Sequence, residues 1–260
     1  MPGNDADLAL LIDAARAAGE IAARHFQRDP DVWYKPGDAG PVTEADIAID
    51  TMLRETLLAA RPDYGWLSEE TPDTPARLGT RRLFIVDPID GTRAFIDGSR
   101  AFAHSLAVVD DGQVTAGVVF LPMMDKLYAS AVGQGATLNG TPIAASVITS
   151  EANANVLTTK TNLCADHWPG GVPQITPQFR SSLAYRMSLV AEGRFDAMMT
   201  FRDTWEWDIA AGALIAAEAG AVISDGYGHP IRFNNPSAQV AGVVTGAPGL
   251  HAALMRRRAA

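Results

Sequence analysis

Leu83-Phe84-Ile85-Val86-Asp87-Pro88-Ile89-Asp90-Gly91-Thr92 is the most informative stretch of this 260-residue sequence. Its first four residues are apolar and predict a short buried strand. Asp87 and Asp90 follow across a proline-directed turn, which can bring both carboxylates into one site. Gly91 allows the backbone to approach a ligand closely, and a helix that begins near Thr92 would offer free N–H groups to an anion.

Two carboxylates beside an anion-binding turn repel each other unless cations lie between them. Mg²⁺ prefers such oxygen ligands and commonly shares its coordination with phosphate. The turn therefore indicates a metal-bridged phosphate site. Taken alone, the same residues are also typical of a capped turn in which an aspartate begins a helix and Pro and Gly serve as turn residues.

Three further acidic features strengthen the metal interpretation. Glu69-Glu70 follow a short apolar stretch at a predicted strand end, Asp46 lies in the first turn of a predicted helix, and Asp208 opens an Ala-rich helix. Each also has an ordinary structural interpretation. The glutamates could be solvated loop charges, Asp46 could form a capping box with Thr43, and Asp208 could be an N-cap.

Hydrophobic periodicity and turn signals divide the sequence into two halves. The first half predicts two helices and then strands, two of which are joined by a hairpin at Asp111-Gly112. The helices are expected over residues 7–27 and 43–60, and the strands over 83–86, 104–110, 113–121 and 126–132. We therefore expect an α+β arrangement with an antiparallel sheet and helices on one face.

The second half predicts strands that alternate with helices, which favours an α/β arrangement with a parallel or mixed sheet. Its strands are expected over 155–159, 197–201, 222–223 and 240–245, and its helices over 182–193, 208–218 and 250–258. Residues 133–152 between the halves are rich in small and polar side chains. We therefore predict a domain boundary near residue 145, with domains over 1–145 and 146–260.

Composition excludes several functional classes. The chain has 30 acidic residues and 21 Lys and Arg, which gives a formal net charge of −9. Such a chain is a poor partner for nucleic acid or anionic lipid, and it has no apolar run long enough to span a bilayer. Cys164 is the only cysteine, which excludes an internal disulfide and a thiolate metal site. The N-terminus lacks a basic region, so no signal peptide is predicted and a cytoplasmic location is expected.

The four acidic segments, taken in order, resemble the inositol monophosphatase superfamily of Mg²⁺-dependent, often lithium-sensitive phosphatases. The matching motifs span about residues 8–250 and read Pro41-Val42-Thr43-Glu44-Ala45-Asp46, Leu67-Ser68-Glu69-Glu70-Thr71, Val86-Asp87-Pro88-Ile89-Asp90-Gly91-Thr92, and Glu206-Trp207-Asp208-Ile209-Ala210-Ala211-Gly212 with Glu218-Ala219-Gly220. The resemblance implies an α/β fold built as a layered αβαβα sandwich. It also implies a homodimer and an active site between the two halves.

The resemblance further implies two or three Mg²⁺ ions per active site. Glu69, Asp87 and the backbone carbonyl of Ile89 would hold one ion. Asp87 would bridge to a second ion held with Asp90 and Asp208. Glu70 would hold a further, weaker ion through water.

Catalytic roles carry over in the same way. Asp46 and Thr92 would orient and deprotonate the attacking water, and Glu69 would act with them through its metal. The N–H groups of Gly91 and Thr92 would hold phosphoryl oxygens. Lys35 stands where the inositol-specific members have a lysine near the site, although it could equally be a solvated loop charge.

Two positions depart from the pattern of the superfamily. Ser68 stands where a glycine is usual, and Ala221 follows Gly220 where a second glycine is common. Neither residue is an expected ligand. The departures therefore concern local backbone geometry and leave the expected set of acids complete.

The second half resembles the bacterial 3′(2′),5′-bisphosphate nucleotidase branch of the superfamily, which hydrolyses adenosine 3′,5′-bisphosphate. The resemblance lies in Ser182-Leu183, Val190-Ala191-Glu192-Gly193 and the Glu-Trp-Asp spelling before the last helix, together with Arg93. Arg180 or Arg186 could pair with a second phosphate, or could form ordinary ion pairs.

Other substrates and other functional classes stay open. Inositol 1-phosphate is the main alternative substrate, followed by histidinol phosphate and fructose 1,6-bisphosphate. A non-catalytic regulatory relative and a pure nucleotide-binding module are alternatives of a different class. Retention of every expected acid favours an enzyme over both.

Overall fold

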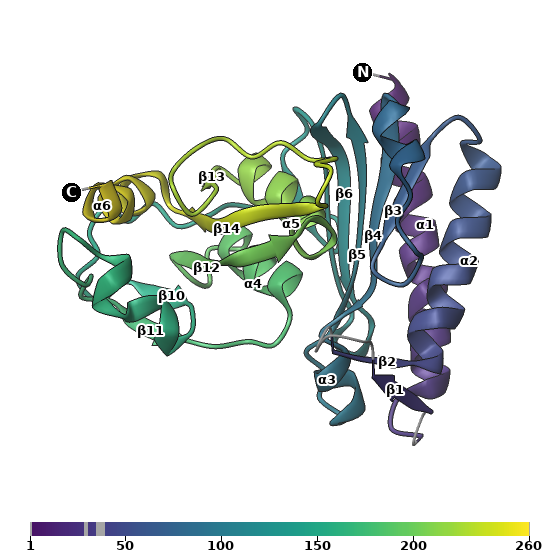
Figure 1. The fold of residues 1–260 in the computed structure, drawn as a ribbon, viewed down its shortest axis with the longest axis horizontal. Helices are drawn as coiled ribbons and strands as arrows, with labels where there is room; N and C mark the ends of the chain where they lie inside the picture. The colour runs from purple at the N-terminus through teal and green to yellow at the C-terminus, as the bar shows by residue number, and fades with distance from the viewer. Residues whose placement is uncertain (1, 29–30, 35–39, 260) are drawn as a thin grey trace.

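Two long N-terminal helices form the outermost layer of the protein. The structure is a computed structural model that describes residues 2–28, 31–34 and 40–259. Helix α1 (Pro2–His25) packs beside α2 (Glu44–Ala60) on the right of Figure 1. Helix α2 begins as predicted, because the Thr43 hydroxyl and the Asp46 carboxylate form a reciprocal capping box.

A seven-stranded sheet forms the second layer. Its order is β3-β4-β5-β6-β7-β8-β9, and its pairs are antiparallel except for the parallel pair β3–β4. The strands are β3 (Gly65–Ser68), β4 (Arg82–Asp90), β5 (Ala103–Asp110), β6 (Gln113–Leu121), β7 (Lys126–Ala131), β8 (Ala136–Leu138) and β9 (Thr141–Ile143). Alternate side chains of β4 enter the cores on opposite faces, Phe84 towards α1 and α2, and Ile85 away from them.

The opposite face of this sheet is covered by α4 (Leu183–Ala191) and α5 (Glu206–Glu218). The two helices of the first half therefore lie on one face of this sheet, as expected, and helices of the second half cover the other face. Strand β5 is buried along nearly its whole length, as a strand covered on both faces must be. Helices of the second half supply this cover, so the pattern of the first half alone could not reveal it.

A five-stranded sheet and a last helix complete the layers. The sheet order is β11-β10-β12-β14-β13, parallel from β11 to β12 and antiparallel from β12 to β13, which confirms the expected mixed sheet. The strands are β10 (Asn155–Leu157), β11 (Thr176–Gln178), β12 (Ala197–Trp205), β13 (Val222–Ser224) and β14 (Gln239–Gly246). Helix α6 (Pro248–Ala259) packs on β14, so the layers read αβαβα from right to left in Figure 1. The predicted fold class is confirmed.

Short elements connect these layers. They are β1 (Val32–Tyr34), β2 (Pro41–Thr43), α3 (Thr92–Ile96) and the 3₁₀ turns η2 (Pro75–Gly79), η3 (Pro122–Met124), η4 (Lys160–Leu163) and η5 (Ala165–His167). One hydrophobic core contains residues of β4, β5, α4, α5 and β14 and therefore crosses the middle of the chain. The boundary near residue 145 stays a prediction. No helix in the described part of the chain is both long enough and apolar enough to cross a membrane.

Candidate active site

A β-bulge brings Asp87 and Asp90 to the same face of the seven-stranded sheet. Strand β4 does not end at Val86 as predicted but continues to Asp90. Asp87 pairs with Ser105 and Asp90 with Ala103, so β4 carries one extra residue there. Residues three apart in a regular strand point to opposite faces, and the extra residue corrects this. The predicted turn is thus a bulge within the strand.

The bulge is held by His104 and closed by Gly91. Nδ1 of the buried His104 lies 2.5 Å from the Pro88 carbonyl oxygen, and burial lowers the pKa of this histidine to about 4. A neutral imidazole therefore donates to that carbonyl. Gly91 has φ of +102°, which disfavours other residues, and it precedes α3 at the predicted position near Thr92.

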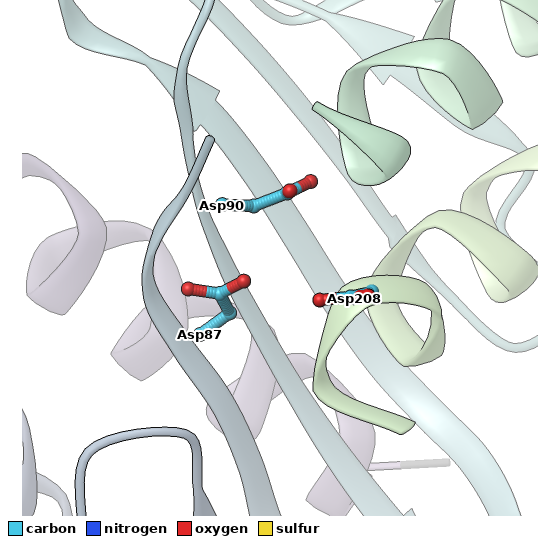
Figure 2. A group of neighbouring side chains, drawn as sticks. All are labelled: Asp87, Asp90 and Asp208. Carbon is cyan, nitrogen blue, oxygen red and sulfur yellow. The ribbon is translucent and has the colours of Figure 1, made fainter. Parts of the chain in front are cut away.

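Asp208 approaches this pair from the other half of the chain. Figure 2 shows the three carboxylates around one space, two from the β4 bulge and one from the first turn of α5. One oxygen from each of Asp87, Asp90 and Asp208 lies within 4.8 Å of the others, a grouping that could hold a metal ion. Asp208 is the third residue of α5, whose N-cap is Trp205, so its interpretation as an N-cap is wrong.

Asp87 is buried with neither carboxylate oxygen hydrogen-bonded to any described residue. Burial, and then the charges of Glu69, Asp90 and Asp208, raise the pKa of Asp87 well above its ordinary value. Burial and neighbouring carboxylates likewise raise the pKa of Asp208. A buried carboxylate without donors, facing two others, is the environment that a divalent cation stabilises.

Asp90 connects the bulge to α4. Its Oδ2 accepts hydrogen bonds from the Ser182 hydroxyl and the Ala184 amide, both at 2.6 Å. Burial raises the pKa of Asp90 to about 6 against the opposing effect of these bonds. Ser182 is the N-cap of α4, as the predicted start at residue 182 implied. The Oδ1 oxygen accepts neither of these two bonds, and one oxygen of Asp90 lies within 4.8 Å of an oxygen of Asp87 and of Asp208.

Asp46 and Thr92 meet beside the carboxylate group. The Thr92 hydroxyl lies 3.2 Å from Asp46 Oδ1 and 3.2 Å from the Ile89 carbonyl oxygen. Asp46 Oδ2 is occupied by the Thr43 amide at 2.8 Å and the Thr43 hydroxyl at 2.5 Å. Burial raises the pKa of Asp46 to about 6. Asp46 therefore caps α2 with one oxygen and contacts Thr92 with the other, so its two predicted roles coexist.

Glu69 and Glu70 follow the end of β3. The parallel pair β3–β4 aligns Ser68 with Val86, so each strand delivers an acid at the next position, Glu69 and Asp87. Glu69 lines the cavity that contains Asp87, Asp90 and Asp208, which has a volume of about 600 Å³. Both glutamates also line a second cavity of about 530 Å³, which shares Glu69, Trp205 and Trp207 with the first.

The wall of the larger cavity carries residues that the sequence analysis did not select. Arg202 and Phe179 line it together with Trp205, and the predicted Arg93 lies there as well. Trp205 is 38% exposed and stacks on buried Trp207, with ring centroids 4.7 Å apart. The sequence signal for Arg202 and Phe179 was weak, because nothing near them forms a motif.

Arg180 and Arg186 are not among the residues that line this cavity, although the charge of Arg186 acts to lower the pKa of Asp90. Lys35 falls outside the described residues. The Arg180 guanidinium lies over the Phe195 ring and donates to the Phe179 carbonyl. Arg186 is buried, stacks over the Phe179 ring at 4.5 Å and donates to the Arg180 carbonyl, and burial lowers its pKa to about 10. Among described residues, the arginines that line the cavity are Arg93 and Arg202.

A buried polar network fixes α5 against the first half. Glu206 is fully buried and accepts three bonds of 2.7 Å from Asn234 and Asn235. Arg77 donates to the same two asparagines and to both oxygens of Asp73. The network therefore runs from the segment after Glu70 to the first turn of α5, where Asp208 lies.

Comparison with known proteins gives matches over nearly the whole chain. Residues 4–259 match the model of the inositol monophosphatase family. An inositol-1-monophosphatase of Rhizobium meliloti is 34% identical, over 86% of this chain and 88% of that protein. A histidinol-phosphatase of Chlorobaculum parvum is 32% identical (84% and 85%), and a 3′(2′),5′-bisphosphate nucleotidase of Escherichia coli is 31% identical (84% and 90%).

A solved structure has the same architecture. The inositol monophosphatase of Thermotoga maritima superposes with a TM-score of 0.82 at 27% identity, over 100% of this chain and 97% of that one. The similar proteins thus carry three different substrate names at nearly equal identity. Overall similarity does not separate these substrates.

Proposed function

Because the chain belongs to the inositol monophosphatase family, whose members are Mg²⁺-dependent phosphatases, we propose that it removes one phosphate from a nucleoside 3′,5′-bisphosphate. Its action on a small phosphorylated molecule follows from the family; the nucleotide is the proposal. The observation that best supports this proposal is one cavity that is lined by the three grouped aspartates and also by Arg202 and Trp205.

The chain's own residues fit the metal. Asp87 has two buried oxygens without a hydrogen-bond donor among described residues, and Asp90 and Asp208 lie within reach of the same ion. We assign these three, Glu69 and the Ile89 carbonyl to two Mg²⁺ ions, with Glu70 at a weaker third site. Bound Mg²⁺ would lower the pKa of water and offset the charge of the phosphate.

Thr92 and Asp46 handle the proton of the attacking water. When the Thr92 hydroxyl donates to Asp46, its oxygen lone pairs are free to accept a hydrogen bond from water. Asp46 cannot rotate away, because Thr43 holds its second oxygen with two bonds. The water is thereby oriented for in-line attack on phosphorus, and the amides of Gly91 and Thr92 would hold phosphoryl oxygens.

The cavity wall supports the choice of a nucleotide. Arg202 is exposed in the cavity, and a guanidinium matches a second phosphate bidentately. Trp205 offers an exposed ring face to a planar base, because its other face stacks on Trp207. A polyol such as inositol needs neither feature, and the cationic amine of histidinol phosphate is disfavoured beside Arg202. We therefore assign the second phosphate to Arg202 rather than to Arg180 or Arg186.

A comparison of two nucleotides tests this assignment. Adenosine 3′,5′-bisphosphate and adenosine 3′-monophosphate present the same reacting phosphate and differ only in the phosphate that Arg202 would bind. We expect Arg202→Gln to lower kcat/KM for the bisphosphate by at least about 10-fold, which is about 1.4 kcal/mol, with little effect on the monophosphate. Arg256→Gln, on the exposed face of α6, is the matched control.

The outcomes separate the substrates. If Arg202→Gln lowers kcat/KM equally for both nucleotides, Arg202 does not bind the second phosphate. A wild-type preference for inositol 1-phosphate or histidinol phosphate would replace the nucleotide as substrate and leave the metal chemistry intact. We also propose a homodimer and a cytoplasmic location, which sedimentation and cell fractionation test.

A further inference from the structure

Asp50 is a buried carboxylate one helical turn beyond Asp46 on α2, and nothing assigned so far uses it. Its Oδ1 accepts a hydrogen bond of 2.5 Å from the Ser68 hydroxyl. Its Oδ2 accepts one of 2.6 Å from the Thr71 hydroxyl. Ser68 and Thr71 flank Glu69 and Glu70 in the sequence. The Asp50 carboxylate therefore binds the residues on both sides of the two glutamates.

The directions of these hydrogen bonds are fixed by chemistry. An indole N–H only donates, and Trp66 Nε1 lies 3.2 Å from the Thr71 hydroxyl oxygen. The Thr71 hydroxyl therefore accepts from Trp66 and donates to Asp50. Burying a carboxylate is costly unless donors satisfy it, and here each oxygen has one. Both oxygens of Asp50 and both hydroxyls, of Ser68 and of Thr71, therefore take part in hydrogen bonds.

The Glu69 amide donates a hydrogen bond of 3.3 Å to the Val86 carbonyl oxygen, just beyond the end of strand β3 at Ser68. The hydrogen bonds of Ser68 and Thr71 to Asp50 hold the chain on both sides of Glu69 and Glu70. Because Val86 directly precedes Asp87, a shift of the Ser68–Thr71 segment moves Glu69 relative to Asp87.

We propose that Asp50 is a positioning residue that fixes Glu69 and Glu70 for metal binding, an inference that rests on the proposed Mg²⁺ site. Carboxylates that orient metal ligands through hydrogen bonds commonly change metal affinity by 10–100-fold when they are lost. The Ser68 hydroxyl supplies one of the two hydrogen bonds to Asp50, and the Thr71 hydroxyl supplies the other.

The test is Mg²⁺ binding measured by calorimetry, with kcat and KM measured at saturating Mg²⁺. Asp50→Asn keeps the shape of the side chain but places an amide against one hydroxyl. We expect its Kd for Mg²⁺ to rise about 10-fold, with kcat largely recovered at saturating Mg²⁺ and KM for substrate little changed. Ser68→Ala should give a smaller rise, and adding it to Asp50→Asn should cause little further loss.

Asp7→Asn is the matched control. Asp7 is also a buried carboxylate with two partners, Arg61 Nε at 2.8 Å and the Tyr64 hydroxyl at 3.0 Å, but these connect α1 to the end of α2. We expect Asp7→Asn to lower the melting temperature and leave the Kd for Mg²⁺ unchanged. If Asp50→Asn behaves in the same way, Asp50 is only structural and the proposal is wrong.

Three further results would also decide the matter. If Asp50→Asn does not fold, Ser68→Ala alone decides, and a Kd within twofold of wild type would overturn the proposal. If wild type itself binds no Mg²⁺, the metal site proposed above fails and the positioning role fails with it. Wild-type binding combined with an unchanged Asp50→Asn Kd would reject the positioning role alone.

Discussion

The Thr92 hydroxyl lies 3.2 Å from Asp46 Oδ1, although 46 residues separate the two in the sequence. The other oxygen of Asp46 caps α2, so the rigid start of a long helix aims this carboxylate at Thr92. Thr92 is the first residue of α3, directly after the bulge that carries Asp87 and Asp90. The β4 bulge and the Asp46–Thr92 contact thus hold the pair that we propose to handle the proton beside the candidate metal ligands.

Removing the Thr92 hydroxyl should impair the chemical step. We expect Thr92→Val to lower kcat by about 10²- to 10⁴-fold, the usual contribution of a positioned proton acceptor, with KM little changed. Thr92→Ser retains the hydroxyl and should retain most of the activity. Equal activity of Thr92→Val and wild type at saturating Mg²⁺ would remove Thr92 from the mechanism.

Asp87→Asn should separate activity from stability. The substitution removes the carboxylate expected to bridge the metals, so Mg²⁺-dependent turnover should be abolished. It also removes a buried charge that faces Asp90 and Asp208, and the metal-free protein at neutral pH should keep its free energy of unfolding or gain about 1 kcal/mol. Urea unfolding in EDTA measures this. A loss of several kcal/mol would show that Asp87 has a structural partner.

The metal-free protein should lose stability as the pH rises. Burial raises the pKa of Asp46 and Asp90 to about 6, and burial with neighbouring charges raises that of Asp87 well above 3.8. A carboxyl whose pKa is higher in the folded than in the unfolded state stabilises fully below the unfolded pKa. That contribution is lost as the pH rises through the folded pKa.

Mg²⁺ should reverse this trend, because it must displace the protons from its ligands. The increase in melting temperature caused by Mg²⁺, relative to EDTA, should therefore grow between about pH 5.5 and about pH 7.5. Asp87→Asn should show little increase at any pH. An increment that is independent of pH in the wild type would contradict the raised pKa values.

Arg77 should contribute to stability through the network between the two halves. Its guanidinium is buried and joins Asp73 to Asn234 and Asn235. We expect Arg77→Met to lower the free energy of unfolding by about 2 kcal/mol, because it leaves the acceptors on Asn234 and Asn235 without their donor. Arg81→Met is the control, because exposed Arg81 pairs with Asp110 at the surface and should cost less than about 1 kcal/mol.

The sequence predicted features that depend on neighbouring residues better than features that depend on packing between distant segments. The capping box at Thr43 and the helix starts near Thr92 and residue 182 follow from neighbouring residues and are confirmed. Asp87 and Asp90 were selected because like charges in a Pro-Gly turn need a cation, and Asp208 was assigned to the same site through the family resemblance. The bulge in β4 could not be predicted, because it depends on pairing with β5 and on a bond to His104.

The wall of the cavity was the least predictable part. The sequence offered Arg180 or Arg186 as a partner for a second phosphate or as half of an ordinary ion pair, whereas in the structure the Arg186 guanidinium stacks on the Phe179 ring and donates to the Arg180 carbonyl. Arg202 carries no motif, and only the position of β12 beside α5 brings it to the cavity. Side chains supplied by distant segments require the packed structure.

The measurement that tests the central claim most directly is inorganic phosphate release by wild type and Asp90→Asn, with about 5 mM Mg²⁺ and with EDTA. Adenosine 3′,5′-bisphosphate, inositol 1-phosphate, histidinol phosphate and fructose 1,6-bisphosphate would be compared in parallel. We predict release that requires Mg²⁺, is greatest from the bisphosphate nucleotide and is abolished by Asp90→Asn. Equally inert wild type and Asp90→Asn on all four substrates, or release unaffected by EDTA, would contradict the account.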